Sequence, residues 1–136
     1  MERDISFTNN VTRMLDWKGI DYTVHTYAYS DDVHSATAVA DAIGMPQEQV
    51  FKTLVARDSA PGQKPALVLI PGSDTLDLKR LAKAAGAKKM QMTARAEAEK
   101  MTGLLAGGIS ALALRNRGFV VYVDGRAQSV ERISIS

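Results

Sequence analysis

The feature that most constrains the fold is a continuous apolar run from Pro65 to Ile70 in the middle of the chain. Such a run is typical of a β-strand buried on both faces, because a half-exposed strand alternates apolar with polar residues. A second strand is expected over Phe51 to Arg57, and the loop between the two strands carries the turn pair Pro61-Gly62. The centre of the chain therefore predicts two strands of a sheet.

The rest of the chain mixes helical and strand patterns without a strict alternation. Helices are expected over residues 8–17, 35–43, 77–86 and 93–103, with a short helical turn over 46–50. Further strands are expected over 21–28, 89–92, 119–124 and 130–135, the last two around a turn at Gly125-Arg126. This order predicts the α+β class, with a curved sheet that is mixed or mainly antiparallel and is flanked by helices.

Composition narrows the class of protein. The chain has 136 residues, of which 46% are hydrophobic and 24% charged, as expected for one globular domain. It has no cysteine, which excludes disulfides, thiol nucleophiles and thiolate metal sites. The N-terminus, Met1 to Asp4, carries three charged residues and leads into no apolar run, so it does not predict a signal peptide, and no run approaches the roughly 20 apolar residues of a membrane span. We therefore expect a cytosolic protein.

Lys52 is the most informative single residue. On an alternating strand it shares a face with Val50, Leu54 and Ala56, and the opposite face carries Phe51, Thr53 and Val55. A lysine between two apolar faces is costly to bury unless it has a partner or borders a pocket, where it can hold a phosphate or a carbonyl oxygen. The alternative is a charge that protects an edge strand from aggregation.

A second candidate is the glycine-rich segment from Thr102 to Ser110. Glycines let backbone N–H groups approach a ligand closely, so such a loop can form an oxyanion hole. A Gly-Gly pair is also common in ordinary turns. Asp124, which precedes Gly125, either orients a polar group or is an ordinary turn residue. Tyr27 either lines a pocket or packs in the core.

One predicted helix carries a cluster of basic residues. Lys79, Arg80 and Lys83 fall within it, and the net charge of the chain is +2. Such a cluster is either a phosphate-binding surface or a solvated helix face. The two histidines, His25 and His34, lie at no metal-ligand spacing, so we expect neither a metal nor another cofactor.

Four segments together resemble the YbaK family, the free-standing relatives of the editing domain of bacterial prolyl-tRNA synthetases. The segments are Asp21 to Tyr27, Gln49 to Val55, Leu76 to Lys89 and Thr102 to Ser110. The resemblance covers nearly the whole chain and implies a barrel-like form of the sheet. It also implies trans-editing, in which the ester bond of a mischarged aminoacyl-tRNA is hydrolysed, typically that of Cys-tRNA(Pro) and in some relatives that of another small amino acid. The acceptor end of tRNA and prolyl-tRNA synthetase are the partners that it suggests.

The resemblance also implies the site residues. Lys52, Gly107 and Gly108 are the expected catalytic groups. The expected substrate-binding residues are Tyr27, Thr53, Gly103, Ile109, Ser110, Asp124 and Ser136. Lys79, Arg80 and Lys83 are expected to bind tRNA phosphates.

The sequence departs from the family pattern at two places. Ala111 stands where the proline after the glycine loop is usual, and Ser136 matches the serine that opens a further motif, strand and helix. We therefore expect an editing domain over residues 1–136 without the usual C-terminal extension, which puts closure of the pocket in question. The alternative function is a non-catalytic module of the same fold that binds aminoacyl-tRNA or a synthetase.

Overall fold

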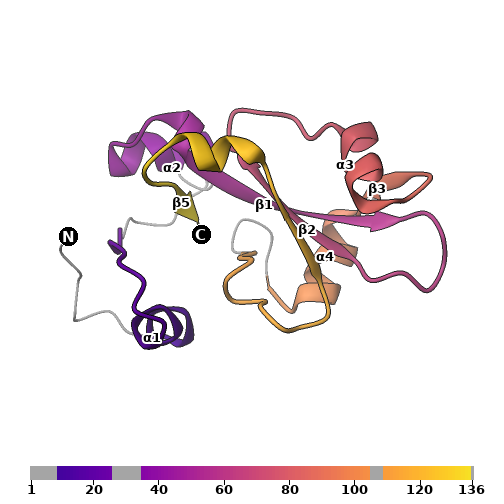
Figure 1. Ribbon diagram of the computed structural model, residues 1–136, viewed down its shortest axis with the longest axis horizontal. Coiled ribbons are helices and arrows are strands. Elements are labelled where there is room, and N and C mark those ends of the chain that lie inside the picture. The colour runs from indigo at the N-terminus through magenta and orange to yellow at the C-terminus, as the bar shows by residue number, and fades with distance from the viewer. Residues whose placement is uncertain (1–8, 26–34, 105–108, 136) are drawn as a thin grey trace.

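The computed structural model describes residues 9–25, 35–104 and 109–135 (Figure 1). Its core is a mixed sheet in the order β3-β1-β2-β4, with β5 also paired to β1. The strands are β1 (Val50–Asp58), β2 (Ala66–Pro71), β3 (Met90–Met92), β4 (Val120–Val123) and β5 (Ser134–Ile135). β1 pairs antiparallel with β2 and β3 and parallel with β5, while β4 runs parallel to β2. The predicted α+β class and mixed sheet are confirmed, but the sheet, as far as it is described, stays open instead of closing into a barrel.

The apolar run at the centre of the sequence forms β2, and every residue of this strand is buried. One face of the sheet packs against α4 (Arg95–Thr102) and the residues that follow it, and Leu67 and Leu69 belong to this cluster. On the other face Val68 and Ile70 pack against α3 (Leu78–Ala85). Figure 1 shows the sheet between these helices. Burial of β2 on both faces therefore follows from its lack of polar residues.

The ends of two predicted helices follow from local hydrogen bonding. α2 (Ala36–Ile43) begins after Ser35, whose hydroxyl accepts the N–H of Ala38 at 3.2 Å. It ends at Gly44, whose φ of 72° is in the left-handed region that favours glycine. α2 packs against Val50 of β1, and a short 3₁₀ turn, η1 (Gln47–Gln49), connects the two. These predicted boundaries are confirmed within a few residues.

The prediction of a strand over 21–28 is wrong for the part that is described. α1 (Asn10–Trp17) ends before this part, and residues 21–25 belong to no strand, with alternating exposed and half-buried side chains. They pair with no described strand; instead the Tyr22 hydroxyl donates to Asp16 and Arg132 donates to Thr23. The alternation in the sequence correctly predicted which side chains are more buried, but it does not predict whether the backbone pairs with another strand.

The predicted pair of strands around Gly125 is also corrected. A 3₁₀ helix, η2 (Gly125–Ser129), follows β4, and β5 contains only two residues. β4 pairs with β2, whereas β5 pairs with the far side of β1, so the chain crosses the end of the sheet between them (Figure 1). The cause is local: Asp124 accepts the N–H of Arg126 at 2.9 Å and starts a helical turn instead of a hairpin.

Candidate functional site

Lys52 lies on β1, beside the central strand β2. It is half-buried and stands opposite Ile70 of β2 in the antiparallel register. The predicted faces of this strand are confirmed, because Leu54 and Ala56 pack with α3 while Phe51 and Val55 pack with α4. On its other side β1 pairs with β5 at Val50 and Phe51 and with β3 from Ala56 onward, and Lys52 falls between these two pairings, so both interpretations of Lys52 stay open. A lysine in this position borders a site or needs a compensating group.

Asp124 and Lys52 lie in one row of the sheet, that is, at positions side by side across neighbouring strands, with Ile70 between them. Asp124 follows β4, and its N–H donates to the carbonyl oxygen of Leu69 at 2.9 Å. Since Val123 is paired with Leu69, Asp124 continues the strand beside Ile70, on the face that carries Tyr122 and Lys52. The structure therefore brings these two predicted residues to one face, on either side of β2.

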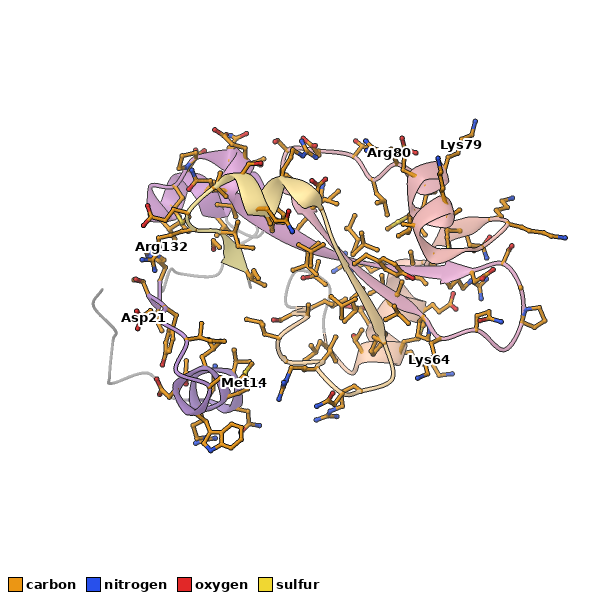
Figure 2. The ribbon with its side chains drawn as sticks, in the orientation of Figure 1. Met14, Asp21, Lys64, Lys79, Arg80 and Arg132 are labelled. Carbon is orange, nitrogen blue, oxygen red and sulfur yellow. The ribbon has the colours of Figure 1, made fainter. Side chains whose placement is uncertain are left out.

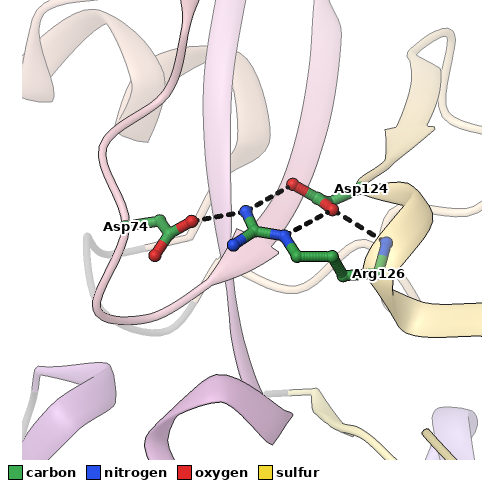
Figure 3. Close-up of polar contacts among 3 residues, drawn as sticks. All are labelled: Asp74, Asp124 and Arg126. Atoms are coloured by element: carbon green, nitrogen blue, oxygen red, sulfur yellow. Dashed lines mark hydrogen bonds and ion pairs between the residues drawn. The ribbon is translucent and has the colours of Figure 1, made fainter. Parts of the chain in front are cut away.

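Asp124 is held by a neighbour that the sequence did not single out. Arg126 donates through Nε to Oδ1 at 3.0 Å and through Nη2 to Oδ2 at 2.8 Å (Figure 3). These side-chain hydrogen bonds are the main reason that the pKa of Asp124 is lowered to about 2, and the charge of Arg80 lowers it further. Asp124 is therefore a turn residue and, at neutral pH, an ionised carboxylate at the same time.

The basic helix α3 covers the same face. Asp77 caps it by accepting the N–H groups of Lys79 and Arg80, each at 3.1 Å, and Leu81 and Ala82 bury its inner side. Lys79, Arg80 and Lys83 are all exposed, and Figure 2 shows Lys79 and Arg80 projecting from the start of the helix. The predicted phosphate-binding side chains are thus accessible on the face that carries Lys52 and Asp124.

Several other predicted residues lie on the opposite side of the sheet. Thr53 stands opposite Leu69, and Ile109 packs against the cluster under α4. Gly103 ends α4 with a φ of 72° and has open space around it. The structure does not bring these three residues into the row of Lys52 and Asp124. Tyr27, Gly107, Gly108 and Ser136 lie outside the described residues.

A groove of about 1000 Å³ lies beside β5. Its walls come from α1, residues 20–25, α2 and its exit, residues 110–113 and residues 131–135. His25, Ser110 and Ile135 line it, and each stands within two residues of an undescribed site candidate, namely Tyr27, Gly108 and Ser136. Ser110 is only 7% exposed, so this polar side chain is largely enclosed at the groove wall.

Neither the row nor the groove has the donor set of a metal site. Among residues 9–25, 35–104 and 109–135, no group of three or more His, Asp or Glu side chains is arranged to hold an ion. In the same part of the chain, no helix combines the length and apolar character needed to cross a bilayer.

The sequence profile of the aminoacyl-tRNA editing domain family matches residues 30–136. The chain belongs to the aminoacyl-tRNA editing domain family. The resemblance found in the sequence is thereby confirmed.

A curated relative of this editing domain comes from Enterococcus faecalis. It is named "Putative Cys-tRNA(Pro)/Cys-tRNA(Cys) deacylase EbsC", and it is 36% identical over 127 residues, which cover 93% of this chain and 76% of the relative. Membership of the family and this relative support a general function in the editing of aminoacyl-tRNA.

Solved structures have the same fold. Hypothetical protein APE2540 superposes with a TM-score of 0.76 and 22% identity, over 92% of this chain and 79% of that one. A crystal structure described as "a putative trans-editing enzyme for prolyl tRNA synthetase" superposes with a TM-score of 0.71 and 19% identity, over 96% and 82% of the two chains. At these identities the superpositions support the fold alone.

Proposed function

We propose that this editing domain hydrolyses the ester bond of mischarged aminoacyl-tRNA, with Cys-tRNA(Pro) as the first candidate substrate and other small amino acids as the next. The observation that carries the proposal is the arrangement on one sheet face, where Lys52 and Asp124 share a row beneath a helix with an exposed basic surface. The name of the relative EbsC supports a cysteinyl substrate. Prolyl-tRNA synthetase is a candidate partner, because it charges the tRNA in question.

Lys52 supplies the electrostatic part of the reaction. Its ammonium group donates to the carbonyl oxygen of the ester and stabilises the negative charge that develops there. An aminoacyl ester is already activated, so a water molecule can attack without a strong general base. With a cysteinyl substrate, the sulfur can attack its own carbonyl carbon instead. A C–S bond then forms, the bond to the ribose oxygen breaks, the ribose oxygen takes a proton, and water later opens the thiolactone.

The remaining candidates fall into three groups. Lys79, Arg80 and Lys83 hold acceptor-end phosphates by contacts that do not read sequence. The groove receives the amino-acid end, with Ser110 in its wall, Tyr27 and Ser136 as further contacts, and the N–H groups of Gly107 and Gly108 as oxyanion donors. Thr53, Gly103 and Ile109 support the site from the other side of the sheet. Lys52 directly follows the residues of β1 that pair with β5, and Ser134 and Ile135 of β5 line the groove.

The test is a deacylation assay with Cys-, Ala- and Ser-charged tRNA(Pro) and with Cys-tRNA(Cys). We expect release of at least one of these amino acids well above the spontaneous rate, with Pro-tRNA(Pro) as the correctly charged control. A rate equal to spontaneous hydrolysis for all four mischarged or cysteinyl substrates would contradict the proposal.

A non-catalytic module is the second candidate function. It is favoured by the separation of Thr53, Gly103 and Ile109 from Lys52, because a catalytic site needs its groups converged. A filter-binding assay run beside the deacylation assay separates the two functions. Retention of charged tRNA without turnover indicates the module, and turnover indicates the enzyme.

A further inference from the structure

Arg126 lies between two carboxylates from distant parts of the chain. It holds Asp124 with a two-bond fork and makes an ion pair through Nη2 with Asp74 (Figure 3). A planar guanidinium suits such a contact, since its donors are fixed relative to one another. The side chain of Arg126 is 56% exposed, so its place is set by these two acids and not by burial.

Asp124 belongs to one half of the proposed site, and Asp74 lies outside it, in the segment that leads into the other half. Asp124 ends the row that contains Lys52. Asp74 lies in the segment between β2 and α3, where its N–H donates to the carbonyl of Pro71 at 3.0 Å, and three residues later Asp77 caps the basic helix. Arg126 therefore connects the end of β4 to the segment that leads into Lys79 and Arg80.

The charges of this cluster stabilise each other. Hydrogen bonds to Asp124 and Asp74 raise the pKa of Arg126 above its ordinary value, while Arg126 and Arg80 lower that of Asp124. The charged groups around Asp124 are thus Arg126 of η2, Arg80 of α3 and Asp74 through Arg126, with Lys52 in the same row of the sheet. The Asp124 carboxylate is ionised and held in one orientation.

We propose that Arg126 is a positioning residue of the deacylation site, which orients the Asp124 carboxylate and ties the basic helix to the row of Lys52. The proposal rests on the proposed function. The phosphates on α3 and the ester at Lys52 belong to the same RNA end, so their binding groups must be held at a fixed spacing for reaction. The competing interpretation is that Arg126 makes only an ordinary exposed ion pair. Such a pair contributes little to stability, and its loss would change neither tRNA binding nor the rate of hydrolysis.

Two variants separate the two roles of Arg126. Asp74→Ala removes the tie to the helix segment and leaves the fork on Asp124 intact. We expect it to weaken binding of uncharged tRNA(Pro) by threefold or more, although it removes a negative charge, and to leave hydrolysis of cysteinyl-adenosine unchanged. Asp41→Ala is the matched control, because it removes the same charge from an exposed position on α2. Its tRNA affinity should equal that of the parent or slightly exceed it.

Arg126→Gln removes both contacts. We expect kcat on Cys-tRNA(Pro) to fall by about tenfold or more. The pKa of Asp124, followed by NMR of its carboxyl carbon, should rise from about 2 toward the ordinary 3.8. Arg126→Lys keeps the charge without the fork and should recover part of both effects. A fold check by circular dichroism accompanies each variant.

The outcomes decide the proposal. If Asp74→Ala binds uncharged tRNA as tightly as the parent does, the proposed link between Arg126 and the basic helix is overturned. If Arg126→Gln keeps the kcat of the parent although the pKa of Asp124 has shifted, the orienting role is overturned. If the parent hydrolyses no charged tRNA, the proposed function fails and the orienting role in deacylation fails with it. The affinity of Asp74→Ala for uncharged tRNA still decides the tie, because that measurement needs no turnover. If the parent itself does not bind uncharged tRNA, the proposed link between Arg126 and the basic helix is overturned as well.

Discussion

Lys52 and Asp124 stand in one row of the sheet, on the same face, with Ile70 of β2 between them. Adjacent strands are about 4.8 Å apart, so the backbones of these two residues are separated by about 10 Å. A positive and a negative side chain therefore stand on either side of the buried Ile70. The predictions below test the parts of this arrangement.

Replacement of Lys52 by alanine should abolish deacylation and leave the fold intact. Loss of one oxyanion contact typically lowers the rate on the order of 10²–10³-fold. Single-turnover hydrolysis of Cys-tRNA(Pro) measures the effect. Lys64→Ala is the control, because Lys64 is exposed and lies away from α3 (Figure 2). Parental activity in Lys52→Ala would show that Lys52 does not contact the reacting ester.

Replacement of Lys79 and Lys83 by glutamine should weaken binding of all tRNAs about equally. If these exposed side chains neutralise phosphates, the logarithm of affinity falls less steeply with the logarithm of salt concentration after they are removed. Hydrolysis of a small aminoacyl-adenosine should stay nearly unchanged. Titrations at several salt concentrations measure the slope, with Lys64→Gln/Lys100→Gln as a control of equal charge. An unchanged slope in the Lys79/Lys83 variant would mean that the tRNA approaches from another side.

Deacylation should be insensitive to chelators. The proposed reaction uses an ammonium group and backbone N–H groups, and the described residues contain no cluster suited to a metal. The assay is repeated after dialysis against EDTA, with and without added zinc. Activity that is lost on dialysis and restored by zinc would contradict the proposed chemistry.

Gly72→Ala should destabilise the fold, because α2 approaches this position closely. A Cβ atom at Gly72 would clash with the Cβ of Ala36 and lie 3.0 Å from the carbonyl oxygen of Val50. Neither atom belongs to a flexible side chain, so overpacking of about 1–3 kcal/mol is expected in urea unfolding. Ala36→Gly in the same chain should recover much of this loss. Failure of the double variant to recover any stability would mean that the contact with Val50 dominates.

The elements that the sequence predicted well depend on interactions within a few residues. Ser35 and Asp77 cap helices through their own neighbours, and the run from Pro65 to Ile70 has no polar side chain to place in water. The two errors, at residues 21–25 and around Gly125, both concern which strand a segment pairs with. Pairing depends on a distant partner, and alternation of side chains does not identify that partner.

The same division holds for the site. The face of Lys52 follows from the alternation of β1, and the exposure of Lys79 and Lys83 follows from the apolar side of the helix. Arg126 and Asp74 were missed, since nothing local joins residues so far apart in the chain. An Arg that follows an Asp-Gly pair is the one signal that could have drawn attention to this position.

By itself, the sequence determined the family, the class of fold, the ends of most helices and the face on which Lys52 lies. The tertiary structure alone decided that Asp124 shares a row with Lys52, that Thr53 and Ile109 lie on the other side, and that Arg126 links β4 to the segment before α3. The physical reason is the range of the interactions. Periodicity and capping act over three or four residues, whereas strand order and ion pairs across the sheet depend on how the whole chain packs.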